Sequence, residues 1–168
     1  MEQMGKVLVV NHEKCTGCRL CELVCAVKHD GISNPARSRI KVMKWETEGL
    51  YIPMSCQQCQ DAPCMNVCPV KAISRDDDMA RVEVDYNVCI GCRSCVAVCP
   101  FGAMNFNVKD KEVFKCDLCD GDPQCVRFCD VDAITYIEVD EVAMEKQRNA
   151  AERISLAGRD AAALEAQM

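Results

Sequence analysis

Short apolar runs separated by polar stretches dominate residues 1–139. Glu46–Gly49 separates two of the runs and is predicted to form a turn, and the acidic triplet Asp76–Asp78 is interpreted as a second, solvated turn. No run is long enough to cross a membrane, so the pattern predicts a soluble domain of short strands and loops. Runs typical of β-strands occur at residues 6–10, 39–45, 50–52, 81–85, 112–114 and 134–139.

From Asp140 onward the pattern becomes that of a single helix. Alanine, glutamate, arginine and glutamine dominate, and mostly small residues recur at alternating spacings of four and three. This periodicity puts them on one narrow stripe of a helix over residues 140–168. The helix either packs on its own domain or docks on another subunit or a second copy of the chain. The stripe consists of Ala143, Gln147, Ala150, Ile154, Ala157, Ala161, Leu164 and Met168.

Cysteine is the residue that changes this picture. The chain has 168 residues, 16 of them cysteine, but only one tryptophan, three tyrosines and four phenylalanines. Domains with so thin an organic core are usually stabilised by disulfides or metals. Residues 1–10 contain one lysine and too short an apolar stretch for a secretory signal. We therefore expect a cytoplasmic protein, in whose reducing surroundings clustered thiols are metal ligands.

The cysteines form four groups of four, with none left over. Groups one and three have the spacing C-x2-C-x2-C-x3-C, group two has C-x2-C-x4-C-x3-C, and group four has C-x2-C-x5-C-x3-C. In this order the groups are Cys15, Cys18, Cys21 and Cys25; Cys56, Cys59, Cys64 and Cys68; Cys89, Cys92, Cys95 and Cys99; and Cys116, Cys119, Cys125 and Cys129.

The repeat extends past the cysteines. Groups two, three and four continue alike, into Pro69–Ile73, Pro100–Met104 and Asp130–Ile134, whereas group one continues into Ala26–His29 and lacks this tail. The repeating unit is therefore a strand, a cysteine loop, a short helix that carries the fourth cysteine, and a turn or strand.

The spacing indicates iron–sulfur clusters. Three cysteines at this spacing offer three thiolates from one loop, and a 4Fe–4S cubane needs four; in the bacterial ferredoxin run C-x2-C-x2-C-x3-C-P the fourth cysteine binds the other cluster of a pair. Group three matches this run through Pro100. Gly17 and Gly91 occupy the same slot in groups one and three, where glycine lets backbone N–H groups approach the sulfurs. The alternatives are disulfides and zinc, the latter chiefly for group four.

With these motifs the chain resembles the polyferredoxin-type electron-transfer subunits, with four 4Fe–4S clusters, that accompany molybdenum and tungsten enzymes. The resemblance covers residues 6–139 and includes Asn34-Pro35-x3-Arg39-Ile40. The compact fourth group, Lys115–Cys125, is similar in particular to the small iron–sulfur subunit of tungsten aldehyde oxidoreductases. The chain lacks the membrane-anchoring segment of larger members, which favours a soluble complex.

The resemblance implies an α+β fold of two nested bacterial-ferredoxin-like modules with a short strand insert and a C-terminal helix. In the four-cluster domain 1–139, groups one and four form one module (1–30 and 111–139), groups two and three form the other (53–110), and residues 31–52 are the insert. Residues 140–168 then form a docking helix. The spacing supports the exchange of the fourth cysteine, but which groups are partners comes from the resemblance alone.

The resemblance also implies four ligand sets. Each set takes three cysteines from one group and the fourth from its partner group. The sets are Cys15, Cys18 and Cys21 with Cys129; Cys116, Cys119 and Cys125 with Cys25; Cys56, Cys59 and Cys64 with Cys99; and Cys89, Cys92 and Cys95 with Cys68.

The expected function is electron transfer between a catalytic tungsten or molybdenum subunit, oxidising aldehydes, and another redox subunit or acceptor. A free-standing polyferredoxin shuttle and a zinc-binding interaction module are the alternatives, but a shuttle needs neither the insert nor the tail. No catalytic site is evident: His12 and His29 lack a nucleophile partner and are interpreted as surface residues. Without a nucleotide-binding glycine motif, any flavin belongs to another subunit. The net charge of −6 argues against nucleic acid.

Two lysines directly precede cysteine groups. Lys14 and Lys115 stand before the first cysteines of groups one and four. A cation there would favour the reduced, more negative cluster. The simpler interpretation, which we adopt at this point, is that both are solvated loop charges.

Overall fold

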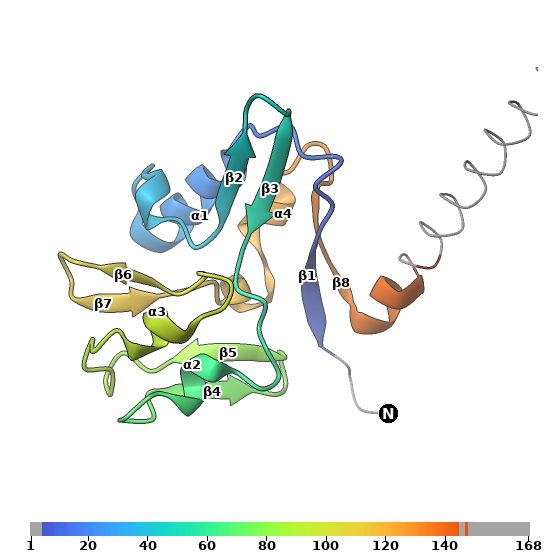
Figure 1. Ribbon diagram of the computed structural model, residues 1–168. Helices are drawn as coiled ribbons and strands as arrows, with labels where there is room; N and C mark the ends of the chain where they lie inside the picture. The colour runs from blue at the N-terminus through green and yellow to red at the C-terminus, as the bar shows by residue number, and fades with distance from the viewer. Residues whose placement is uncertain (1–4, 145–146, 148–168) are drawn as a thin grey trace, which may run out of the picture.

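Short strands alternate with short helices along the chain. The computed structural model describes residues 5–144 and 147 (Figure 1). All six predicted strands are present, and two further ones, β4 and β6, begin at the end of the tail of group two and directly after the tail of group three. The strands are β1 (Lys6–Val10), β2 (Lys41–Trp45), β3 (Leu50–Met54), β4 (Ile73–Asp76), β5 (Arg81–Val84), β6 (Asn105–Asn107), β7 (Glu112–Phe114) and β8 (Ile134–Glu138).

The helices are short because each is confined to one cysteine group or loop. Of the four helices that carry cysteines, α1 alone exceeds five residues, because group one continues as a helix where the other groups have their tail. The described α-helices are α1 (Leu20–Asp30), α2 (Pro63–Asn66), α3 (Ser94–Val98) and α4 (Gln124–Arg127), and the 3-10 helices are η1 (Pro35–Arg37) and η2 (Leu118–Gly121).

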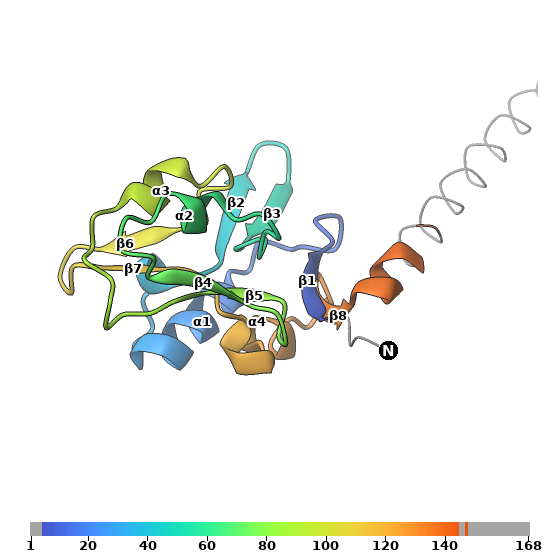
Figure 2. The same ribbon diagram turned by 90° about the horizontal axis from the view of Figure 1, so that it is seen from below.

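The strands pair antiparallel in four two-stranded sheets, β1–β8, β2–β3, β4–β5 and β6–β7. The register of β1–β8 runs from Lys6 opposite Glu138 to Val10 opposite Ile134, so the two ends of the four-group region lie side by side. Helix α1 packs on α4, and α2 packs on α3. Figure 2 shows α1 and α4 together on one side and α2 and α3 together on the other. Groups one and four thus lie together on one side of the molecule and groups two and three on the other, in an α+β ferredoxin-like fold.

Two apolar cores correspond to the two helix pairs. The outer core, around α1 and α4, combines Ile40, Val42 and Ile134 with buried cysteines of groups one and four. The inner core, around α2 and α3, combines Ile73, Val82 and other apolar residues with Cys95. Further half-buried cysteines pack against both cores. Thiols therefore stand at the centre of each core, where a larger domain would have aliphatic and aromatic side chains.

The insert between groups one and two belongs to the outer core. Ile40 and Val42 are buried in it. Glu22 of α1 has a side chain that is 0% exposed, and its Oε1 accepts a hydrogen bond of 2.6 Å from the backbone N–H of Val42. Its Oε2 accepts from Arg19 Nε at 3.0 Å. This buried carboxylate fastens the β2–β3 hairpin to the helix of group one.

The chain becomes helical after β8, as its pattern predicts. Residues 139–144 and residue 147 are helical, and the rest of the predicted stripe lies outside the described residues. Within the described part of the chain, no helix combines the length and the apolar character needed to cross a bilayer.

Candidate metal centres

One cavity gathers cysteines of groups two and three. Its wall contains Cys56, Cys59 and Cys64 of group two together with Cys99, the fourth cysteine of group three. Apolar side chains of both groups complete it, including Met104 and Phe101. Burial raises the pKa of the Cys64 thiol, and the charges of Cys56 and Cys99 raise it further. The structure therefore brings together the four residues of one expected ligand set.

A second cavity has the reciprocal composition. Cys89, Cys92 and Cys95 of group three line it with Cys68, the fourth cysteine of group two. Burial, with additional contributions from Cys64, Cys92 and Cys89, raises the pKa of Cys95 to about 11. The fourth cysteine of each of these two groups thus lies in the cavity of the other group's first three cysteines.

Group four shows the same arrangement with the fourth cysteine of group one. Burial raises the pKa of Cys116 to about 12 and also raises that of Cys119 and Cys125, and in all three the charge of Cys25 contributes to the increase. Cys25, the fourth cysteine of group one, therefore lies beside the first three cysteines of group four. The reciprocal Cys129 packs on the same core as Cys15 and Cys21.

The donor set fits iron–sulfur clusters. Among the described residues all sixteen cysteines are free thiols. Burial raises the pKa of Cys21 to about 12, and further cysteine charges add to the increase, so four crowded thiolates are unfavourable without positive metal ions to compensate them. Thiolates are the ligands that 4Fe–4S clusters require.

Backbone N–H groups point at three of the four fourth cysteines. Ala72 N donates to Cys68 Sγ at 3.2 Å, and Ala133 N donates to Cys129 Sγ at 3.3 Å. Both alanines stand four residues after their cysteine, in the tail that groups two and four share. Cys25 of group one instead receives its hydrogen bond from Arg39 N of the insert, at 3.3 Å. Such bonds stabilise negative charge on the sulfur.

The two expected loop glycines are required by the fold. Gly17 has φ +70° and Gly91 has φ +64°, which disfavours any residue with a side chain. A Cβ would lie 2.6 Å from the ring of Tyr51 at Gly17 and 2.5 Å from the carbonyl oxygen of Lys111 at Gly91. These close approaches seat the loops of groups one and three against the rest of the chain.

Two residues of the site differ from their predicted environments. Lys115 is only 3% exposed, so the interpretation of it as a solvated charge is wrong, whereas Lys14 is exposed as expected. His29 is also not a surface residue: its side chain is 11% exposed, and its Nε2 lies 3.6 Å from Cys119 Sγ and 3.5 Å from Asp117 Oδ1. His12 is exposed, as predicted. Lys115 contacts Gln58, and His29 contacts Cys119, from segments far away in sequence, which pattern alone does not reveal.

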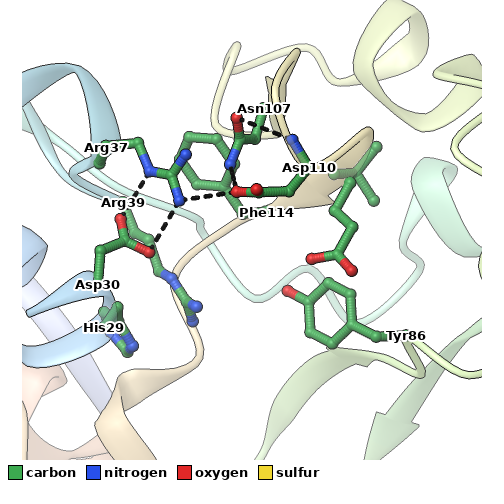
Figure 3. A pocket seen from close by; sticks show the side chains of 10 residues that line it. His29, Asp30, Arg37, Arg39, Tyr86, Asn107, Asp110 and Phe114 are labelled. Carbon is green, nitrogen blue, oxygen red and sulfur yellow. Dashed lines mark hydrogen bonds and ion pairs between the residues drawn. The ribbon is translucent and has the colours of Figure 1, made fainter.

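A charged cavity of about 230 Å³ separates the end of α1 from the β6–β7 hairpin (Figure 3). Arg37 lies between Asp30 of the outer module and Asp110 of the inner one, at 2.9 and 3.0 Å. A hydrogen bond from Arg37 lowers the pKa of Asp30. No cysteine lines this cavity, so its charges connect the modules and it is not a cluster site.

Comparisons with known proteins agree with this geometry. A family model described as 4Fe-4S dicluster domain matches residues 47–138, and one described as 4Fe-4S binding domain matches residues 12–28. The polyferredoxin-like subunit of aliphatic sulfonate oxidoreductase from Pyrococcus furiosus is 41% identical over 122 residues, covering 73% of this chain and 70% of that protein. The putative electron transport protein YsaA from Escherichia coli is 39% identical over 160 residues, covering 86% and 98%.

A third relative is the thiosulfate reductase electron transfer subunit PhsB of Salmonella typhi, 32% identical over 153 residues and covering 83% of this chain and 79% of that protein. These relatives are electron-transfer proteins or subunits, not catalytic enzymes. The dicluster match includes group four, for which spacing alone left zinc open. Sixteen cysteines and these domains correspond to four 4Fe–4S clusters. The chain belongs to the 4Fe–4S dicluster family of ferredoxin-like electron-transfer proteins.

Proposed function

We propose that the chain carries electrons through its four clusters between a catalytic subunit with a tungsten or molybdenum cofactor and another redox subunit or acceptor. The observation that carries this proposal is the pair of reciprocal cavities, each lined by three cysteines of one group and the fourth of another. Exchange of the fourth ligand holds two clusters close together in one module. Two such modules in one chain provide a series of four clusters, along which electrons can pass between redox sites that lie far apart in a complex.

The four ligand sets follow the same exchange. Each cluster, when bound, accepts and releases one electron, while the surrounding residues fix its position and its reduction potential. The sets would be Cys15, Cys18, Cys21 and Cys129; Cys116, Cys119, Cys125 and Cys25; Cys56, Cys59, Cys64 and Cys99; and Cys89, Cys92, Cys95 and Cys68.

Electrons would enter and leave at the loops of groups one and three. Cys18 and Cys92 are the exposed cysteines of the chain, and Ile90, between Cys89 and Cys92, is 64% exposed. Cys116 of group four is buried, and its carbonyl oxygen accepts a hydrogen bond from Gln58 of group two. The order of transfer along the chain is therefore one, four, two and three, in either direction.

The preferred partner is a tungsten-dependent, aldehyde-oxidising subunit, because the compact fourth group is similar to the small subunits of such enzymes. The sulfonate oxidoreductase and thiosulfate reductase relatives support an oxidoreductase complex in general. A flavin subunit is the second candidate partner.

Residues 140–168 are the proposed docking element, for a partner or for a second copy of the chain. The proposed location is the cytoplasm, whose reducing surroundings keep free thiols available as metal ligands.

Anaerobic purification of the tagged, full-length chain from the organism that produces it tests this proposal. We expect about sixteen iron and sixteen acid-labile sulfide per chain, together with tungsten or molybdenum in a co-purifying subunit. A chain with all its iron, no partner and neither metal is the result expected for a free-standing shuttle. About twelve iron per chain would remove one group, group four first, from the ligand sets.

Deletion of residues 141–168 tests the docking element separately. Intact clusters in a smaller assembly are the expected result, measured by iron content and by light scattering. Lost clusters at an unchanged assembly size would show that these residues belong to the fold.

A further inference from the structure

Lys115 is a buried cation without an anionic partner among the described residues. Its Nζ donates to the carbonyl oxygen of Cys116 at 2.7 Å and to Gln58 Oε1 at 3.3 Å. The ion pairs of the described chain do not include it. A buried ammonium held only by neutral oxygens is costly. Its position therefore requires negative charge close by.

Two cluster sites flank this ammonium, one from each module. Lys115 lines the cavity of Cys56, Cys59, Cys64 and Cys99, and it directly precedes Cys116, the first ligand of the group-four set. Its Nζ also donates to the carbonyl oxygen of Cys116. Lys115 therefore lies beside cysteines on both sides of the boundary between the modules.

Gln58 fixes the position of the ammonium. It stands between Cys56 and Cys59 in the group-two loop, and its Nε2 donates to the carbonyl oxygen of Cys116 at 2.8 Å. Its Oε1 accepts from the backbone N–H of Val82 at 2.8 Å as well as from Lys115. One amide thus ties the group-two loop to the group-four loop with Lys115 between them.

We propose that Lys115, positioned by Gln58, is a shared fixed charge that raises the reduction potentials of the two clusters on either side of the module boundary. Reduction makes each cluster more negative, so a fixed cation beside the cluster stabilises the reduced form. One charge acting on both clusters keeps their potentials close to each other, which favours electron passage between the modules. The inference rests on the proposed ligand sets.

The test is a redox titration of the purified full-length holoprotein, monitored by electron paramagnetic resonance. Lys115→Met removes the charge at similar side-chain length. It is expected to shift the reduction equilibrium of two of the four clusters at least tenfold towards the oxidised form, which lowers their potentials by about 59 mV for one electron. Lys115→Arg keeps the charge and is expected to keep the wild-type potentials. Lys14→Met is the matched control, because Lys14 directly precedes Cys15 as Lys115 precedes Cys116, but is exposed. It is expected to change the reduction equilibrium of each of the four clusters by less than twofold.

Gln58→Glu keeps the lysine and places a negative charge against it. It is expected to lower the same two potentials, and it covers the case in which Lys115→Met fails to retain its clusters. Unchanged potentials in a variant with full iron content, a shift confined to one cluster, or an equal shift in Lys14→Met would each overturn the inference. A wild-type chain with fewer than four clusters would instead refute the ligand sets, so the two failures are distinguishable by iron analysis.

Discussion

Group one and groups two and four reach the same arrangement around their fourth cysteines by different means. In groups two and four the turn of the tail, with positive φ at Lys71 and Asp132, presents the backbone N–H of the next alanine to the cysteine sulfur. In group one the chain continues as α1, and the N–H comes from Arg39, fourteen residues after Cys25. The insert therefore takes over the role of a missing tail and is part of a cluster site.

The same difference accounts for His29. It stands four residues after Cys25, where groups two and four have Ala72 and Ala133. Because α1 continues through this position, its side chain is carried to Cys119, a member of the same proposed ligand set as Cys25. In groups one, two and four a backbone N–H thus donates to the sulfur of the fourth cysteine, although different segments of the chain provide it.

Removal of the iron is expected to have the largest effect, because it affects group one and groups two and four alike. Anaerobic chelation of the iron is expected to unfold both modules, because cysteines lie in both cores and little other apolar mass is available. Circular dichroism should show no cooperative melt, and hydrogen exchange should show no protection of β2–β3. An insert that stays protected without iron would mean that it folds independently of the cluster it serves.

The next effect concerns the attachment of the insert. Glu22→Gln weakens the charged hydrogen bonds to Val42 N and Arg19 and is expected to cost about 1.5–3 kcal/mol. Glu48→Gln makes the same change on the exposed turn of the hairpin and should have little effect. Denaturant titration, followed by cluster absorption and electron paramagnetic resonance, should show the outer module losing its clusters first. Equal loss from both modules would contradict a specific role of the insert.

Much of the fold could be predicted from the sequence. The runs at 6–10 and 112–114 coincide with β1 and β7, since valine and phenylalanine favour strands. The strands β4 and β6, with the sequences ISRD and NFN, cannot be recognised from the sequence because they are short and largely polar. Their pairing with β5 and β7, which no local pattern encodes, makes them strands.

The environment of charged residues was the part that could not be predicted. Lys14 and Lys115 stand in the same register before a cysteine group, yet only Lys115 is buried, because Gln58 of another group reaches over it. Gln58 and Lys115 are 57 residues apart in the sequence. The burial of His29 depends in the same way on Asp117 and Cys119. Both environments arise from contacts between different cysteine groups. The cysteine spacing suggests that the groups pair, but it does not say which residues come into contact.

The backbone N–H of Arg39 can be removed to test whether the insert replaces the missing tail of group one. Arg39→Pro eliminates the donor to Cys25 Sγ, and the preceding Ser38, with ψ 141°, is already in the conformation that proline requires. We expect the potential of the cluster bound by Cys25 to fall by a few tens of millivolts, less than the roughly 59 mV of a tenfold change, in a redox titration. Arg39→Ala keeps the N–H while losing the ion pair with Asp117, so it separates the backbone contribution from that of the side chain.

The smallest expected effect is that of His29, which distinguishes the side-chain contact of group one from the backbone contacts of the other groups. Its Nε2 lies 3.6 Å from Cys119 Sγ, farther than the 3.3 Å from Arg39 N to Cys25 Sγ, and it is shared with Asp117. A longer and divided contact stabilises the reduced cluster less. His29→Phe is therefore expected to lower the potential of that cluster by about twofold in the reduction equilibrium, or ~18 mV, at unchanged iron content. His12→Phe, at an exposed position, is the control. A shift in His29→Phe as large as that in Arg39→Pro would show that the helix of group one, and not its insert, replaces the missing tail.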